Sequence, residues 1–126
     1  MVVDWLSFGK DFSEKNEMNI NAQIKSLCRQ IVENFNPQKI ILFGSYAYGK
    51  PNADSDVDLL VVMPFEGRNH EQVVKIRQKL KTSVPLDLLV RTSEQMRERI
   101  EMEDFFMREI AERGKVLYEA DNAGMD

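Results

Sequence analysis

Two short apolar runs separated by a polar loop restrict the folds open to this chain more than any other feature. The first run covers residues 39–43, and the second covers residues 56–63 and stops at Pro64. Each run has the length of a strand and is too short for a helix. The loop between them, residues 49–55, is rich in Gly, Pro, Asn and Asp. Because this connection is short for the crossover that joins parallel strands, we expect a mixed sheet.

Apolar residues outside these runs recur at helical spacing in three places. The clearest stretch begins at Asn19 and ends near Asn36, and it predicts one amphipathic helix. Capping patterns at Asn69 with Gln72, and at Thr92, predict the starts of two more helical regions. In the last region we expect the inner side to consist of Met96, Ile100, Phe105, Phe106 and Ile110.

Two further strands complete the predicted sheet, at Leu86–Val90 after Pro85 and at Lys115–Tyr118. Strands that alternate with helices indicate an α/β or α+β fold, in which a small mixed β-sheet is flanked by helices. The length of 126 residues fits a single domain, 1–126. We place its core at about residues 20–118 and expect the N-terminal segment and the C-terminal tail to be peripheral.

Composition narrows the class of protein. The formal net charge is −4, from 17 basic and 21 acidic side chains, which argues against a broad basic surface for nucleic acid. The single cysteine, Cys28, excludes an internal disulfide and favours a reducing compartment. No apolar run approaches the length that spans a bilayer, and the N-terminus lacks a signal pattern. We therefore expect a soluble cytoplasmic protein without a membrane partner.

Carboxylates mark the start of the second strand. Asp56 and Asp58 are two residues apart, so on a strand they share one face, and their charges repel unless a cation lies between them. Asp87 lies near the start of the third strand, and if the two strands are neighbours the three carboxylates converge. Such a set suits two Mg²⁺ ions, bridged by Asp56 and Asp58, with Asp87 on the ion that activates an attacking hydroxyl. The alternatives are turn chemistry for Asp56 and an ion pair with Arg91 for Asp87.

Gly44 and Ser45 follow the first strand directly, before a predicted helical turn. Glycine lets the backbone approach a phosphate, and the amides at the start of the turn, with the Ser45 hydroxyl, can donate to phosphate oxygens. Ser45 is also a candidate for an ordinary helix N-cap, and the two roles are compatible. Together with Mg²⁺, this turn indicates binding of a nucleoside triphosphate. Basic side chains would balance its charge, and the candidates are Lys50, Arg68 and Arg91.

The same segment also fits the start of a P-loop, because Gly44 to Lys50 reads G-x4-G-K. A P-loop continues with Ser or Thr, whose hydroxyl binds Mg²⁺, and with a helix. Pro51 stands at that position and offers neither a hydroxyl nor an N–H. We therefore reject a P-loop.

Other side chains carry weaker information. Tyr46 and Tyr48 either stack on a base or pack beside the short helical turn. Cys28 lies on an apolar helical stripe, where we expect it in the core, and we expect His70, the only histidine, in solvent. Four apolar residues exceed what one helix face needs, so they either extend the core or form an exposed patch for a partner: Met102, Phe105, Phe106 and Met107.

The combination of Gly-Ser, a spacer, Asp-x-Asp and a later strand Asp resembles the nucleotidyltransferases of the DNA polymerase beta superfamily. The spacing GS-x10-DxD is similar to that of the small branch called minimal nucleotidyltransferases (MNT). The resemblance covers roughly Ile20 to Tyr118 and implies a nucleotidyltransferase fold. It also implies that both metals are held by Asp56 and Asp58, one of them by Asp87, and the triphosphate by Gly44 and Ser45.

The same resemblance implies a function, namely Mg²⁺-dependent transfer of AMP from ATP to a hydroxyl of a partner protein. Many members are encoded beside an all-helical HEPN protein, a ribonuclease-type toxin, and act as its antitoxin. The resemblance thus implies a HEPN-domain partner, and it leaves homo-oligomers open. One alternative is a non-catalytic antitoxin that neutralises its partner sterically. Another is transfer to a small molecule such as an aminoglycoside, against which the short chain counts.

Overall fold

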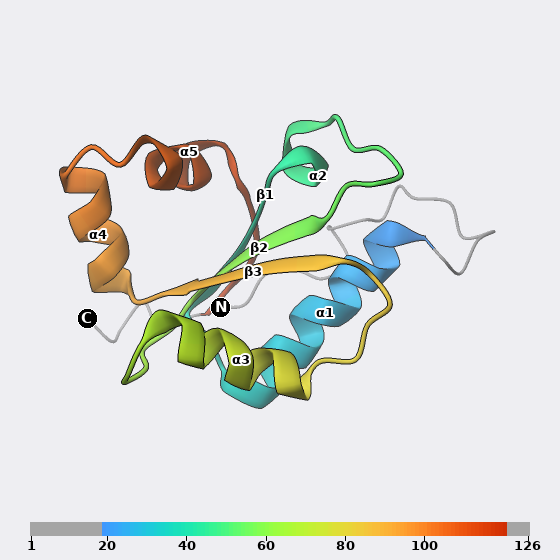
Figure 1. Ribbon diagram of the computed structural model, residues 1–126, viewed down its shortest axis with the longest axis horizontal. Coiled ribbons are helices and arrows are strands. Elements are labelled where there is room, and N and C mark those ends of the chain that lie inside the picture. The colour runs from blue at the N-terminus through green and yellow to red at the C-terminus, as the bar shows by residue number, and fades with distance from the viewer. Residues whose placement is uncertain (1–18, 121–126) are drawn as a thin grey trace.

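The computed structural model describes residues 19–120, and a four-stranded sheet lies at its centre (Figure 1). The strands are β1 (Lys39–Phe43), β2 (Val57–Val62), β3 (Leu86–Arg91) and β4 (Lys115–Glu119), in the spatial order β3-β2-β1-β4. Strand β1 pairs antiparallel with both β2 and β4, whereas β2 and β3 are parallel. The predicted mixed sheet is therefore confirmed. The predicted peripheral segments before residue 19 and after residue 120 lie outside the described residues.

Helices cover both faces of the sheet (Figure 1). One face is covered by α1 (Ile20–Phe35) and α3 (Asn69–Lys79), and the other by α4 (Ser93–Glu101) and α5 (Phe105–Arg113). The single-turn helix α2 (Ser45–Tyr48) follows the end of β1. None of the helices within residues 19–120 is both long and apolar enough to cross a bilayer.

Alternation along β2 explains why this strand is central. Val57, Leu59 and Val61 face α1 and α3, and Leu60 and Val62 face α5, with all five side chains buried. A strand that is apolar on both faces is stable only between two layers of helices. Asp58, Leu60 and Val62 alternate along β2 and so share one face, which means that Asp58 projects from the α5 side of the sheet.

The start of α3 differs by one residue from the prediction. Asn69 is the first helical residue, and the Arg68 amide donates to the Glu71 side chain at 3.3 Å, so the capping residue is Arg68. With the helix starting at Asn69, Gln72 and Ile76 lie on the face that points to the sheet, and both side chains are buried. The capping box predicted at Thr92 is confirmed.

The prediction for the last helical region was wrong at two positions. Phe105 and Phe106 are 73% and 52% exposed, whereas Met107 is 2% exposed and lies in the core. The region is two helices, because the backbone turns at Glu103, which has a φ of 64°, and Asp104 then caps α5 by accepting from the Met107 amide. A new helix start resets the helical phase, so the side chains expected inside point outward.

Candidate active site

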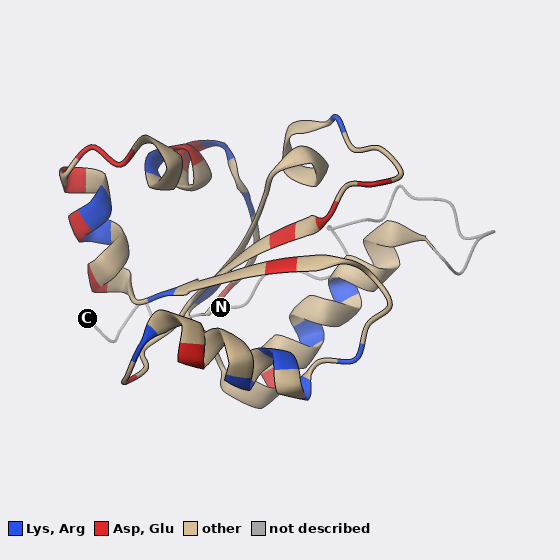
Figure 2. Ribbon diagram, in the orientation of Figure 1, with Lys and Arg blue, Asp and Glu red and all other residues tan. Residues whose placement is uncertain are grey.

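The first residues of β2 and β3 bring two carboxylates together. Asp58 and Asp87 are register partners in the parallel pair, and Figure 2 shows acidic positions side by side on these two strands. Adjacent residues at the same level of neighbouring strands project from the same face. The expectation that the two strands are neighbours is confirmed, whereas the expected convergence of three carboxylates is met only for Asp58 and Asp87 among the described residues. Asp56 lies just before β2 and is exposed.

Electrostatics couple the three acids. The pKa of Asp58 is raised from 3.8 to about 6, first by burial, then by the charges of Asp87 and Asp56, and by a hydrogen bond with the Asp87 carboxyl group. Like charges near one another disfavour the ionised form of each. The site therefore favours either a proton or a cation between the carboxyl groups.

The donor set of this site is all oxygen. Within residues 19–120, no three side chains of His, Cys, Asp or Glu form a ready-made metal cluster. Mg²⁺ is usually held by one or two carboxylates together with water and substrate phosphates, so it needs no such cluster. The pair Asp58 and Asp87, with Asp56 within electrostatic range, fits Mg²⁺ that is bound together with a polyphosphate.

Gly44 lies directly against the Asp58 carboxylate. A Cβ atom at Gly44 would overlap that carboxylate and would lie 2.9 Å from its Cγ. The backbone at Gly44 has φ 76° and ψ −161°, a region that only glycine adopts readily. Glycine is thus required here for two reasons, space and conformation, and the turn after β1 and the acid on β2 form one site.

The turn after Gly44 offers unused donors. Gly44 is the N-cap of α2 and Ser45 is its first residue, so the additional role of Ser45 as N-cap was wrong. Among the residues that the structure describes, the amides of Ser45 and Tyr46 donate to no carbonyl, and the Ser45 hydroxyl has no hydrogen-bond partner. Free donors beside two carboxylates can take up phosphate oxygens, with a cation between the phosphate and the acids.

Comparisons with known proteins identify the family of this chain. The family described as "Polymerase beta, Nucleotidyltransferase" matches residues 22–123. The chain belongs to this nucleotidyltransferase family. A protein of Methanocaldococcus jannaschii named "Putative protein adenylyltransferase" is 32% identical over 105 residues, which are 80% of this chain and 100% of that protein. A crystal structure of a "putative nucleotidyltransferase" from Sulfolobus solfataricus is 20% identical, covers 69% of this chain and 85% of its own, and has a TM-score of 0.48.

The alternative that Asp87 forms an ion pair with Arg91 is wrong for this nucleotidyltransferase. Arg91 lies at the opposite end of β3, where its guanidinium donates to the Val90 carbonyl at 2.7 Å. Burial, and then the charge of Arg99, lower the pKa of Arg91. Within residues 19–120, no ion pair joins Arg91 to Asp87, so Asp87 is free to act with Asp58.

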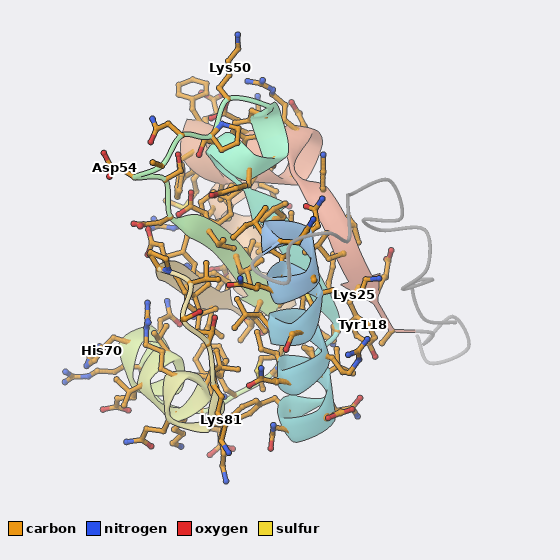
Figure 3. The ribbon with its side chains drawn as sticks, turned by 90° about the vertical axis from the view of Figure 1, so that its right-hand side faces the viewer. Lys25, Lys50, Asp54, His70, Lys81 and Tyr118 are labelled. Carbon is orange, nitrogen blue, oxygen red and sulfur yellow. The ribbon has the colours of Figure 1, made fainter. Side chains whose placement is uncertain are left out.

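The structure separates two of the three predicted basic candidates, Arg68 and Arg91, from the site. Arg68 caps α3 beyond the far end of β2, and Arg91 is at the far end of β3. Lys50 stays beside the turn, because its backbone amide donates to the Ser45 carbonyl at 3.1 Å, and its side chain is exposed and extends away from the body of the nucleotidyltransferase (Figure 3).

Arg113 is a basic residue near the site that the sequence patterns did not indicate. Its guanidinium lies 4.5 Å from the centroid of the Tyr48 ring and pairs with Glu109 at 2.9 Å. The pKa of Tyr48 is raised by burial, then by the charge of Glu109, and to a smaller extent by the charge of Asp58. A hydrogen bond with the Gly44 backbone and the charge of Arg113 act in the opposite direction and lower this pKa. Arg113 thus lies close to the Gly44 turn. Only the antiparallel pairing of β1 with β4 reveals this, because it places residues before β4 beside residues after β1.

The remaining candidates are structural. Tyr46 packs against the α1 side and Tyr48 against the α5 side, as the packing interpretation predicted. Cys28 is fully buried, and burial raises the pKa of its thiol to about 12. His70 is exposed on α3 and points to solvent, as expected (Figure 3).

Proposed function

We propose that this protein transfers AMP from ATP to a hydroxyl group of a partner protein. The observation that carries the proposal is the pairing of Asp58 with Asp87 directly beside the Gly44 turn, in a chain of the nucleotidyltransferase family. A relative that is 32% identical carries the name of a protein adenylyltransferase, which supports a protein acceptor.

Each residue of the site has a part in the proposed reaction. Asp56, Asp58 and Asp87 would hold Mg²⁺, which supplies neutralisation of phosphate charge and alignment of the reacting groups when bound. The Ser45 hydroxyl and the amides of Ser45 and Tyr46 would hold the β- and γ-phosphates. Arg113 would compensate their negative charge.

The chemistry is an in-line displacement at the α-phosphorus. The acceptor oxygen forms a bond to that phosphorus, the bond to the β-phosphate bridging oxygen breaks, and pyrophosphate leaves. In this proposal the hydroxyl proton passes to the Asp87 carboxylate, which is exposed and adjoins the Asp58 carboxyl group. Positioning and electrostatic stabilisation provide most of the rate in such transfers.

We further propose that the acceptor is a HEPN-domain protein encoded beside this chain, so that the protein acts as an antitoxin. The resemblance to minimal nucleotidyltransferases supports this partner.

The test combines the purified protein, the neighbouring HEPN protein, Mg²⁺ and ATP labelled at the α-phosphate. Transfer of label to the HEPN protein is expected with the natural sequence and with Asp54→Asn, and not with Asp58→Asn. Asp54 is the matched control, because it is an exposed loop carboxylate that projects away from the sheet (Figure 3). Equal neutralisation of the HEPN protein by all three proteins without any label would instead establish steric neutralisation.

A further inference from the structure

Three apolar side chains are exposed where α4 meets α5. Met102 and Phe105 are each 73% exposed and Phe106 is 52% exposed, and we refer to these three residues as the α4–α5 apolar surface. The other large apolar residues that are exposed within residues 19–120 are single positions, Val74 on α3 and Val116 on β4. Clustered exposed apolar groups typically mark a binding surface, whereas single ones are normal.

Phe106 brings one edge of this surface near the carboxylates, whereas Met102 lies toward Arg91 at the other end of β3. The Phe106 ring meets the Phe43 ring edge to face, with centroids 5.8 Å apart and an interplanar angle of 81°. Phe43 is the register partner of Asp58, and both project from the α5 side of the sheet. Side chains opposite one another on neighbouring strands lie about 5 Å apart. The Phe43 side chain therefore lies between Phe106 and Asp58, the acid that pairs with Asp87.

The proposed reaction needs a second substrate at this place. An acceptor oxygen must come to about 3–3.5 Å from the α-phosphorus, so the surface that binds the acceptor must adjoin Asp58 and Asp87. The loop of residues 49–56, which joins α2 to β2, contains no large apolar residue. Apolar contact with an acceptor is available on the side of the α4–α5 apolar surface.

Charge around the surface indicates the character of the partner. Glu101 and Glu103 flank Met102, are exposed, and form no ion pair within residues 19–120, whereas Asp104 is paired with Arg99 at 3.6 Å. Figure 2 shows the connection between α4 and α5 as acidic. Basic side chains lie on the helices as well, and Arg108 donates to the Ile100 carbonyl at 3.5 Å, so within the described chain the unpaired acidic groups beside Met102 are Glu101 and Glu103. Like charges across an interface are unfavourable, so these two carboxylates favour a partner with basic residues opposite them.

We propose that the α4–α5 apolar surface docks the acceptor polypeptide. The acceptor would carry apolar side chains near its reactive hydroxyl, flanked by Lys or Arg residues that face Glu101 and Glu103. This inference rests on the proposed nucleotidyl transfer, and it adds the surface that selects the acceptor. A polypeptide is favoured over a nucleobase because the three side chains lie beyond Phe43, on helices rather than in the Gly44 turn.

The test uses α-labelled ATP, Mg²⁺ and a nucleotide-free cell extract of the source organism as the probe. Four proteins are compared: the natural sequence, Phe105→Ser with Phe106→Ser, the matched control Val74→Ser, and Asp58→Asn. We expect the natural protein and Val74→Ser to label the same extract protein, and the double variant to lose at least about tenfold in labelling rate with unchanged ATP affinity. Phe105→Leu with Phe106→Leu should restore most of the rate, and raised NaCl should lower it.

The outcomes separate this proposal from the proposed function. Normal labelling by the double variant would overturn the docking surface while leaving nucleotidyl transfer intact. A parallel loss of ATP affinity would assign the rings to the nucleobase, and a change in oligomeric state would assign them to a second copy, and each would also overturn it. If the natural protein binds ATP and labels nothing, the proposed function fails and the docking surface fails with it.

Discussion

Asp58 and Asp87 share a hydrogen bond between their carboxyl groups across the parallel strands β2 and β3. Two acids so placed interact unfavourably when both are ionised, so the site stores electrostatic repulsion in the folded protein. Such repulsion is measurable, because it makes stability depend on pH and on divalent cations.

Asp58→Asn should stabilise the metal-free protein above about pH 6. The folded-state pKa of Asp58 is raised from 3.8 to about 6, so the stability linked to its protonation is fully present below pH 3.8 and is lost as the pH rises through about 6. The whole shift corresponds to about 3 kcal/mol, which solvent screening around this half-exposed group reduces to about 1 kcal/mol. Urea unfolding over this pH range measures the difference, and identical pH profiles for the two proteins would contradict the repulsion.

Mg²⁺ should stabilise the natural protein against unfolding, as Asp58→Asn should. A cation bound by the folded state alone raises the free energy of unfolding. We expect a rise in the thermal midpoint with Mg²⁺ for the natural protein and for Asp54→Asn, and a smaller rise for Asp58→Asn. Equal shifts in all three would place the cation elsewhere.

Gly44→Ala should destabilise the fold and damage the site, whereas Gly49→Ala should only destabilise it mildly. Both glycines have positive φ, 76° and 96°, but a Cβ at Gly44 meets the Asp58 carboxylate and a Cβ at Gly49 meets nothing within 4 Å. We expect a loss of about 3 kcal/mol at Gly44 and about 1 kcal/mol at Gly49. Urea unfolding gives the two values, and ATP titration should show weakened binding for the Gly44 variant alone.

Arg113→Gln should weaken nucleotide binding in proportion to the number of phosphates. If Arg113 compensates the β- and γ-phosphates, affinity should fall about tenfold for ATP, less for ADP and hardly for AMP. Arg97→Gln is the matched control, because it removes the same charge from an exposed position on α4. Calorimetric titration with the three nucleotides measures this, and an equal loss for AMP would show that the variant disturbs the site in another way.

Ser45→Ala should leave the free energy of unfolding within about 0.5 kcal/mol of the natural value, because the hydroxyl has no partner within residues 19–120. It should lower ATP affinity about fivefold through loss of one hydrogen bond to phosphate. Ser83→Ala, at an exposed position after α3, serves as the control. Destabilisation by Ser45→Ala would mean that the hydroxyl supports the turn instead.

Local patterns in the sequence were sufficient for the elements that carry the site. The two apolar runs, the capping box at Thr92 and the Gly44–Ser45 turn each depend on neighbours within a few residues. Strand alternation and helix caps are set by local sterics and hydrogen bonds, so they can be read without the fold. Local patterns did not show that β2 and β3 are neighbouring parallel strands, on which the meeting of Asp58 and Asp87 depends.

Tertiary structure decided which of these residues touch. The strand order β3-β2-β1-β4 places Asp87 beside Asp58, and the pairing of β4 with β1 brings Arg113 to the Gly44 turn. The backbone turn at Glu103 exposes Phe105 and Phe106, which helical spacing alone had placed inside. The sequence by itself therefore determined the elements and the kinds of chemical group, because these follow from local periodicity. Pairing and exposure came only from the packed structure, because they depend on the burial of residues far apart in the chain.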